Sequence, residues 1–151
     1  MDERTYRPMR NVSIRTPVHA SAAALWDMIG RFNTLGQWHP LVQHSDTRGS
    51  GKGALRRLRM MNGATLVERL EHVSDTERVY LYSVLAGPLP VDHCVAELRV
   101  IDQGNGTSVI EWSSAFVASR AAEREATKAL KDVYILQNVK RIYESLSTRS
   151  D

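Results

Sequence analysis

The feature that most constrains the fold is a row of six strand-like segments between residues 42 and 118. Clusters of Gly, Asn, Asp and Pro separate the segments, and the connections are short. Strands joined in this way pair antiparallel, because a parallel pair needs a crossover of about a dozen residues or more. The segments are Val42–Thr47, Ala54–Met61, Ala64–Val73, Arg78–Ala86, Asp92–Asp102 and Thr107–Ala118. The sequence therefore predicts an antiparallel meander.

Before this meander, the pattern predicts one more strand and two short helices. The alternation over Asn11–Thr16 is typical of a half-buried strand, which we expect Pro17 to end. Ser21 is a suitable N-cap for a helix that runs to about Phe32, and a short helical turn is expected at Asn33–Gln37. Together with the meander, this makes a seven-stranded sheet.

The last part of the chain, from about Ala121 to Leu146, is rich in Ala, Glu, Lys and Leu and has one apolar stripe. A long amphipathic helix must bury that stripe, and the curved sheet offers the large surface that it needs. We therefore predict an α+β fold, in which a seven-stranded antiparallel sheet wraps around a long C-terminal helix. A bent sheet cannot touch a straight helix along its whole length, so a small-molecule cavity is expected between them.

Composition limits the class of protein. The chain has 151 residues, of which 42% are hydrophobic and 25% are charged, as in one soluble domain of ordinary size. We expect residues 1–10 to be a polar tail and residues 11–147 to form a single ligand-binding domain. Cys94 is the only cysteine, and there is no long apolar run, so we expect a cytoplasmic protein without a membrane span, a metal site or a cofactor.

The net charge of +3 raises the question of nucleic-acid binding, which depends on where the 20 basic residues lie. They are dispersed, and the densest group is Arg56, Arg57 and Arg59. A phosphate-binding surface needs a contiguous basic stripe. We therefore expect no nucleic-acid partner.

Strand parity predicts which side chains face the helix, since successive side chains point to opposite faces of a sheet. In each strand, the more apolar of the two faces is taken as the inner one. This face comprises Leu66, Glu68, Leu70 and His72; Tyr80, Tyr82 and Val84; Cys94, Ala96, Leu98 and Val100; and Ile110, Trp112, Ser114 and Phe116.

Glu68 is unusual because a carboxylate among inward leucines must be paired, hydrated or protonated. Arg56 is the favoured partner, and Arg57 is the alternative, depending on the hairpin register. A three-residue loop at Asn62–Ala64 would place Arg56 opposite Leu70, whereas a two-residue turn would place Arg57 opposite Glu68. A buried ion pair that only holds two strands in register is an equally good interpretation.

Several short motifs occur in an order that resembles the SRPBCC superfamily, in particular its bacterial polyketide cyclase/dehydrase-like branch. The motifs are ALWDMIGRFNTLGQWHPLV, GKGALRRL, VERLEHV, ERVYLYSVLAGPLP and VIEW, and the resemblance covers about residues 11–146. It implies a helix-grip fold of the START and birch-pollen-allergen type, with a deep cavity between the sheet and the C-terminal helix. Because members of this superfamily differ in what they bind, the fold leaves the function open.

A comparison within that superfamily suggests roles for His39 and Glu68. In the plant abscisic-acid receptors, the lysine that binds the ligand carboxylate corresponds to His39, and a cavity glutamate corresponds to Glu68. The two loops that close those receptors correspond to Met61–Ala64 and Gly87–Pro90. The alternative for His39 is a structural role at a corner, with a hydrogen bond to a carbonyl.

These observations predict three functions. The first is binding of a hydrophobic small molecule, whether aromatic, polyketide-like or lipid-like. The second is a polyketide cyclase, aromatase or dehydratase that uses His39 and Glu68 as acid and base. The third is a ligand-gated protein-interaction module, and a homodimer is also possible. The candidate ligand-binding residues are Arg56, Tyr80, Tyr82, Val84, Cys94, Trp112, Ser114, Phe116, Leu130, Tyr134 and Asn138.

Overall fold

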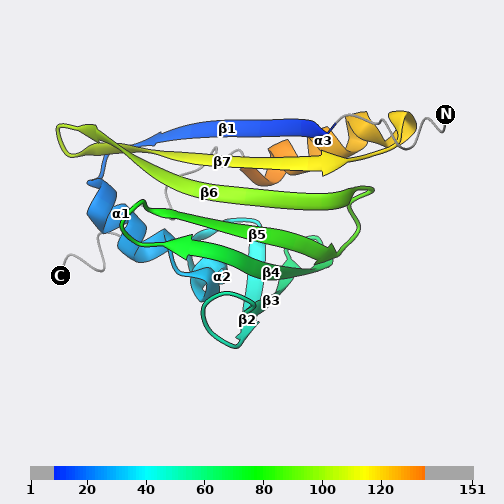
Figure 1. Ribbon diagram of the computed structural model, residues 1–151, viewed down its shortest axis with the longest axis horizontal. Coiled ribbons are helices and arrows are strands. Elements are labelled where there is room, and N and C mark those ends of the chain that lie inside the picture. Colours follow the sequence, from blue (N-terminus) through cyan, green and yellow to red (C-terminus); the bar gives the residue numbers. More distant parts are fainter. Residues whose placement is uncertain (1–8, 135–151) are drawn as a thin grey trace.

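A computed structural model describes residues 9–134 of the chain. Seven strands form one sheet in the order β1-β7-β6-β5-β4-β3-β2, and every neighbouring pair is antiparallel (Figure 1). The strands are β1 (Arg10–Val18), β2 (Val42–Arg48), β3 (Leu55–Met60), β4 (Thr65–Ser74), β5 (Val79–Ala86), β6 (Asp92–Gly104) and β7 (Thr107–Val117). The predicted antiparallel meander is confirmed.

Three helical elements separate β1 from β2, and a longer helix follows β7. They are α1 (Ala22–Ile29), the 3-10 turn η2 (Phe32–Thr34), α2 (Leu35–Trp38) and α3 (Arg120–Tyr134). Ser21 caps α1 as predicted, since its hydroxyl accepts a hydrogen bond from the Ala24 N–H at 3.2 Å. The α+β helix-grip arrangement predicted from the sequence is confirmed. Within residues 9–134, no helix combines the length and the apolarity needed to cross a bilayer.

The first strand is longer than predicted. It continues through Pro17, which pairs with Val109, and ends at Val18. Pro17 does not end the strand because β1 lies at the edge of the sheet, where a residue without an N–H can turn its nitrogen away from the neighbouring strand. The strand also begins at Arg10, one residue before the predicted start.

Bulges in β2 and β4 change which side chains face the helices. The pairing of β4 with β5 shifts between Leu70 and His72, so that Val73 pairs with Tyr80 on the concave face. The prediction that His72 faces inward was therefore wrong, and its side chain is exposed. Parity counting fails beyond a bulge because one extra residue reverses the alternation.

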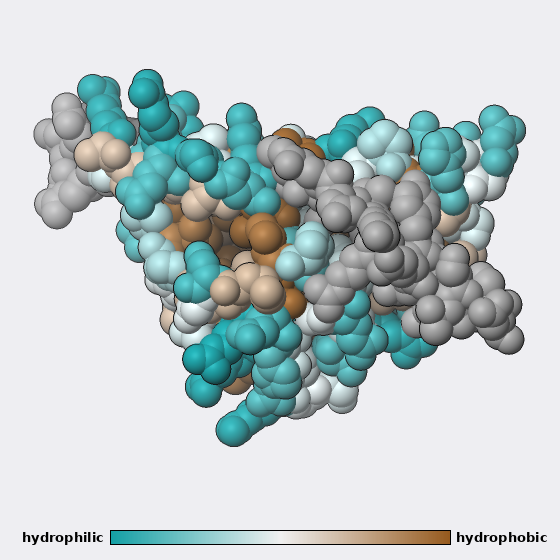
Figure 2. Space-filling view, turned by 180° about the vertical axis from the view of Figure 1, so that it is seen from behind, coloured by the Kyte–Doolittle hydropathy of each residue, from teal (hydrophilic) through white to brown (hydrophobic). Residues whose placement is uncertain are grey.

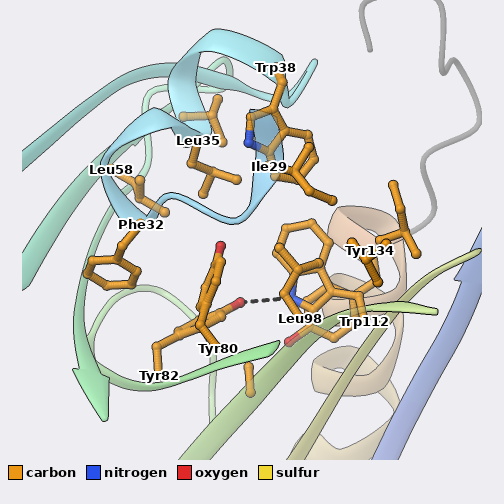
Figure 3. Packing of buried hydrophobic residues seen from close by; sticks show 14 of the residues in the cluster. Ile29, Phe32, Leu35, Trp38, Leu58, Tyr80, Tyr82, Leu98, Trp112 and Tyr134 are labelled. Carbon is orange, nitrogen blue, oxygen red and sulfur yellow. Dashed lines mark hydrogen bonds between the residues drawn. The ribbon is translucent and has the colours of Figure 1, made fainter. Parts of the chain in front are cut away.

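The core lies between the concave face of the sheet and the helices. Buried side chains from α1, η2 and α2 meet those of the central strands, and Tyr134 of α3 closes the cluster from another side (Figure 3). The close approach of α2 to β2 depends on Gly36, because a Cβ there would lie 3.1 Å from the Ser45 nitrogen. This packing positions the candidate site at the centre of the concave face.

Candidate functional site

The polar centre of the concave face is a buried ion pair between Arg56 of β3 and Glu68 of β4. The two residues lie directly opposite each other in the sheet. Arg56 is the partner favoured from the sequence, but neither register considered there occurs. The turn begins one residue earlier, at Met61, and the Met60 N–H donates to the Ala64 carbonyl.

Arg56 makes polar contacts in three directions. Its Nε and Nη2 donate to Oε1 of Glu68 at 3.0 and 2.6 Å. Its Nη1 donates to the Phe32 carbonyl at 3.0 Å and to the Tyr80 hydroxyl at 3.3 Å. The guanidinium also lies 4.0 Å from the centre of the Phe32 ring, a cation–π distance. The pair thus connects β3, β4, β5 and the η2 turn.

Burial acts in opposite ways on the two partners. It raises the pKa of Glu68 above its ordinary value, and the neighbouring Arg56 offsets only part of this effect. For Arg56, burial on its own lowers the pKa, but Tyr80, Glu68 and Tyr82 more than compensate, so the pKa lies above its ordinary value. Arg56 is therefore a permanent cation, and Glu68 is the member of the pair that titrates.

Aromatic side chains surround this pair on the side of α3. The Trp112 Nε1 donates to the Tyr82 hydroxyl at 2.9 Å, and the Trp112 ring stacks on Tyr134 with centroids 4.9 Å apart (Figure 3). Burial raises the pKa of Tyr80, Tyr82 and Tyr134, so all three hydroxyls are neutral near pH 7. They can donate or accept hydrogen bonds but supply no charge.

His39 is completely buried between β2 and α3. Its Nδ1 accepts a hydrogen bond from the Leu41 N–H at 3.1 Å, so Nε2 carries the proton and donates to the Val133 carbonyl at 2.8 Å. Both ring nitrogens are engaged with the backbone. This geometry matches the structural alternative for His39, a hydrogen bond to a carbonyl.

The other candidates lie mostly where strand parity placed them. Cys94, Phe116 and Ser114 are buried on the inner side of the sheet and Leu130 is buried on α3, whereas Asn138 lies outside the described residues. Burial raises the pKa of the Cys94 thiol to about 11, so this residue is a small apolar group and not a nucleophile at neutral pH. Within residues 9–134, no three His, Cys, Asp or Glu side chains are arranged to hold a metal ion.

An apolar hollow opens beside α3. Figure 2 shows it as a recess with a hydrophobic floor, framed by hydrophilic side chains. Residues 9–134 leave the inner face of the sheet incompletely covered near the start of β4 and the end of β5, where Leu66 and Val84 are only partly buried although they point inward. Leu89 and Val91, which connect β5 to β6, are partly buried as well. The concave face therefore has an accessible apolar region near its polar centre.

Three contributors were missed from the sequence. Phe32 supplies both a ring and a carbonyl to Arg56, and Ser45 and Thr47 place hydroxyls on the concave face, opposite Leu58 and Arg56. Parity could not find the hydroxyls because both faces of β2 are polar after Val42, and a bulge between Val42 and His44 reverses the alternation. The Phe32 contact joins residues that are 24 positions apart, so local sequence carries no signal for it.

The profile of the family described as polyketide cyclase / dehydrase and lipid transport matches residues 9–147. The chain belongs to this family. No curated protein matches the chain.

Several solved structures resemble this chain along nearly its whole length. The protein XoxI from Bacillus cereus is 28% identical, with a TM-score of 0.81 over 95% of this chain and 99% of the other. A protein from Thermobifida fusca is 25% identical, with a TM-score of 0.78 over 91% and 93%. Zhui aromatase/cyclase from a Streptomyces species is 19% identical, with a TM-score of 0.72 over 95% and 97%, which shows a shared fold alone.

Proposed function

We propose that this protein binds a hydrophobic small molecule, aromatic, polyketide-like or lipid-like, between the concave face of the sheet and α3. The family includes lipid transport in its description, and the apolar hollow beside α3 offers a matching surface. Clefts of this kind combine apolar walls with a few polar groups that orient the ligand. The hydroxyls of Tyr82, Tyr134 and Ser114 are suited to that role.

Ser114 supports this assignment of polar contacts. Its side chain is buried on the concave face beside Tyr134, and the two hydroxyls lie within hydrogen-bonding reach of each other. Hydroxyls both donate and accept, so this pair can also bond to a ligand oxygen or nitrogen. The Arg56 guanidinium, in contrast, is already occupied by Glu68, Phe32 and Tyr80.

The state of His39, one of the two candidate acid–base groups, is the observation that favours binding over catalysis. Both ring nitrogens of His39 hold backbone groups, and Glu68 accepts two hydrogen bonds from Arg56. A general base must be within reach of the proton that it removes and must have a lone pair free to take it. His39 would have to give up a structural hydrogen bond before it could act, whereas both bonds from Arg56 end on Oε1 of Glu68 and leave its Oε2 unused by Arg56.

Binding can be tested by calorimetry with 2-naphthoic acid, an anthraquinone and dodecanoic acid as aromatic, polyketide-like and lipid-like probes. Val84→Trp would place a large ring on the incompletely covered part of the inner face, since Val84 points inward, and we expect it to weaken binding of the best probe at least tenfold. Val95→Trp is the matched control, because Val95 is exposed on the outer face, and it should leave Kd unchanged. If none of the probes binds, or if both variants behave like the wild type, the proposal is wrong.

The cyclase, aromatase or dehydratase role is the second candidate, supported by the family description and by the raised pKa of the buried Glu68. Turnover of a linear β-polyketide analogue separates the two. If the wild type converts the analogue and Glu68→Gln or His39→Ala abolishes conversion while binding persists, the enzymatic role replaces simple binding. If the wild type binds the analogue and leaves it unchanged, the binding role stands.

A further inference from the structure

A second pocket lies at the other end of β4 and β5, away from the hollow beside α3. Its volume is about 490 Å³, and its walls come from the chain between α1 and η2, from β2 and from the glycine-rich loop before β3. The residues that matter for its chemistry are Phe32, Ser45, Thr47, Leu70, Val73 and Tyr80. Val73 lines the pocket because of the bulge in β4. This volume is in the range of small-molecule sites.

The pocket is separate from the polar centre but shares a wall with it. Phe32 and Tyr80 line the pocket, and on their other side they hold the Arg56 guanidinium through a carbonyl and a hydroxyl. Neither Arg56 nor Glu68 is among the lining residues. Of the ligand-binding residues predicted from the sequence, only Tyr80 belongs to this pocket.

Two hydroxyls on the wall have unmet hydrogen-bonding capacity. Ser45 and Thr47 point to the concave face, because they lie opposite Leu58 and Arg56 in the register of β2 with β3. Their oxygens are inaccessible to solvent and have no hydrogen-bond partner among the described residues. Leaving such groups unpaired costs free energy that a bound polar group would recover.

The remaining walls determine the kind of ligand. Phe32 offers an aromatic edge and Val73 an aliphatic surface, while Tyr80 and Leu70 lie buried behind them in the wall. Arg31 is the one charged residue that lines the pocket within the described part of the chain, and its guanidinium is largely exposed and paired with Asp27 at 3.3 Å. No buried charge is available to neutralise an ion, and burying an unpaired ion is unfavourable.

We propose that this pocket is a binding site for a small uncharged molecule that carries an aromatic ring and a hydroxyl or carboxamide group. The ring packs against Phe32 and Val73, and the polar group bonds to the hydroxyls of Ser45 and Thr47 once rotation about χ1 turns them into the pocket. This inference does not depend on the function proposed for the hollow beside α3, since the two regions lie at opposite ends of β4 and β5.

The site can be tested by NMR titration of the full chain with 4-hydroxybenzamide into the millimolar range. Binding should shift the amide resonances of Thr47, Ser50 and Ala54, and leave those of Leu66 and Val84 unchanged. Thr47→Val keeps the shape of the side chain and removes the hydroxyl, and we expect it to weaken binding about fivefold, the usual effect of one neutral hydrogen bond. Thr65→Val is the matched control, because Thr65 is exposed on the outer face of β4.

Folding does not complicate the result, because the Thr47 hydroxyl has no partner to lose. The melting temperature of Thr47→Val without probe should therefore equal or exceed that of the wild type. An unchanged Kd for Thr47→Val, an equal loss in Thr65→Val, shifts confined to Leu66 and Val84, or the absence of any shift would each overturn the proposal.

Discussion

Arg56 and Glu68 show how a charged pair can occupy the centre of an otherwise aromatic and aliphatic core. Arg56 is completely buried and Glu68 is nearly so, and taking both charges out of water is costly. The cost is offset because every direction of the guanidinium ends in an acceptor or an aromatic face. The pair also fixes the register of β3 with β4, because a slip by one residue would turn one partner to solvent.

Glu68 should make stability depend on pH in a defined direction. Its pKa is raised in the folded protein, so the native state binds the proton more tightly than the unfolded chain does. The stability that Glu68 protonation contributes is fully present below the ordinary carboxyl pKa of about 4.3. It is lost as pH rises through the pKa of Glu68 in the folded protein. Urea unfolding between pH 4 and 7 should show the wild type losing stability relative to Glu68→Gln as pH rises.

Glu71 provides a control of opposite sign on the same strand. Hydrogen bonds from Arg69 and Ser83 lower the pKa of Glu71. The stability that ionised Glu71 contributes to the folded state is therefore lost as pH falls. The wild type should therefore lose stability relative to Glu71→Gln towards acid pH. If the wild type instead gains stability relative to Glu68→Gln as pH rises, the raised pKa of Glu68 is contradicted.

At the scale of elements, His39 connects the start of β2 to the described end of α3. The His39 imidazole accepts a hydrogen bond from the Leu41 N–H and donates one to the Val133 carbonyl. Trp112 stacks on Tyr134 and so contacts the same turn of the helix. The docking of α3 therefore rests on a few specific contacts together with the apolar stripe of Ala126, Leu130 and Tyr134.

His39→Ala should loosen α3 more than the sheet. The change removes two hydrogen bonds and leaves a cavity, which together cost about 2–4 kcal/mol. Hydrogen exchange followed by mass spectrometry should show faster exchange in Ala126–Tyr134 than in the wild type, with little change in the centre of β6. His44→Ala, in the exposed part of β2, should leave the exchange of α3 unaltered. Equal acceleration in α3 and β6 would mean that His39 stabilises the fold globally and does not anchor the helix.

At the scale of the whole molecule, the concave face is divided by the wall of Arg56, Phe32 and Tyr80 into two separate regions. The apolar hollow lies on the side of α3, and the pocket with the hydroxyls of Ser45 and Thr47 lies on the side of α1 and η2. The possible homodimer stays a prediction, for which the sheet edges at β1 and β2 are the natural places to look.

This division predicts that two ligands can bind at once. A saturating amount of the best hydrophobic probe should leave the Kd of 4-hydroxybenzamide within a factor of about two, since distant independent sites have nearly additive free energies. The NMR titration described above measures this directly. Mutual displacement of the two probes would show that they share one site.

Turn residues and hydrophobic periodicity are local signals, so the order and type of the elements could be predicted from the sequence. The inward direction of Glu68, Tyr80, Tyr82 and Trp112 could be predicted too, since parity holds wherever a strand is regular. The folded structure was needed for the features that depend on pairing: the turn that sets Arg56 opposite Glu68, the bulges that turn Val73, Ser45 and Thr47 inward, and the contact of Phe32 with Arg56. Such features depend on which distant residues meet, and no local pattern contains that information.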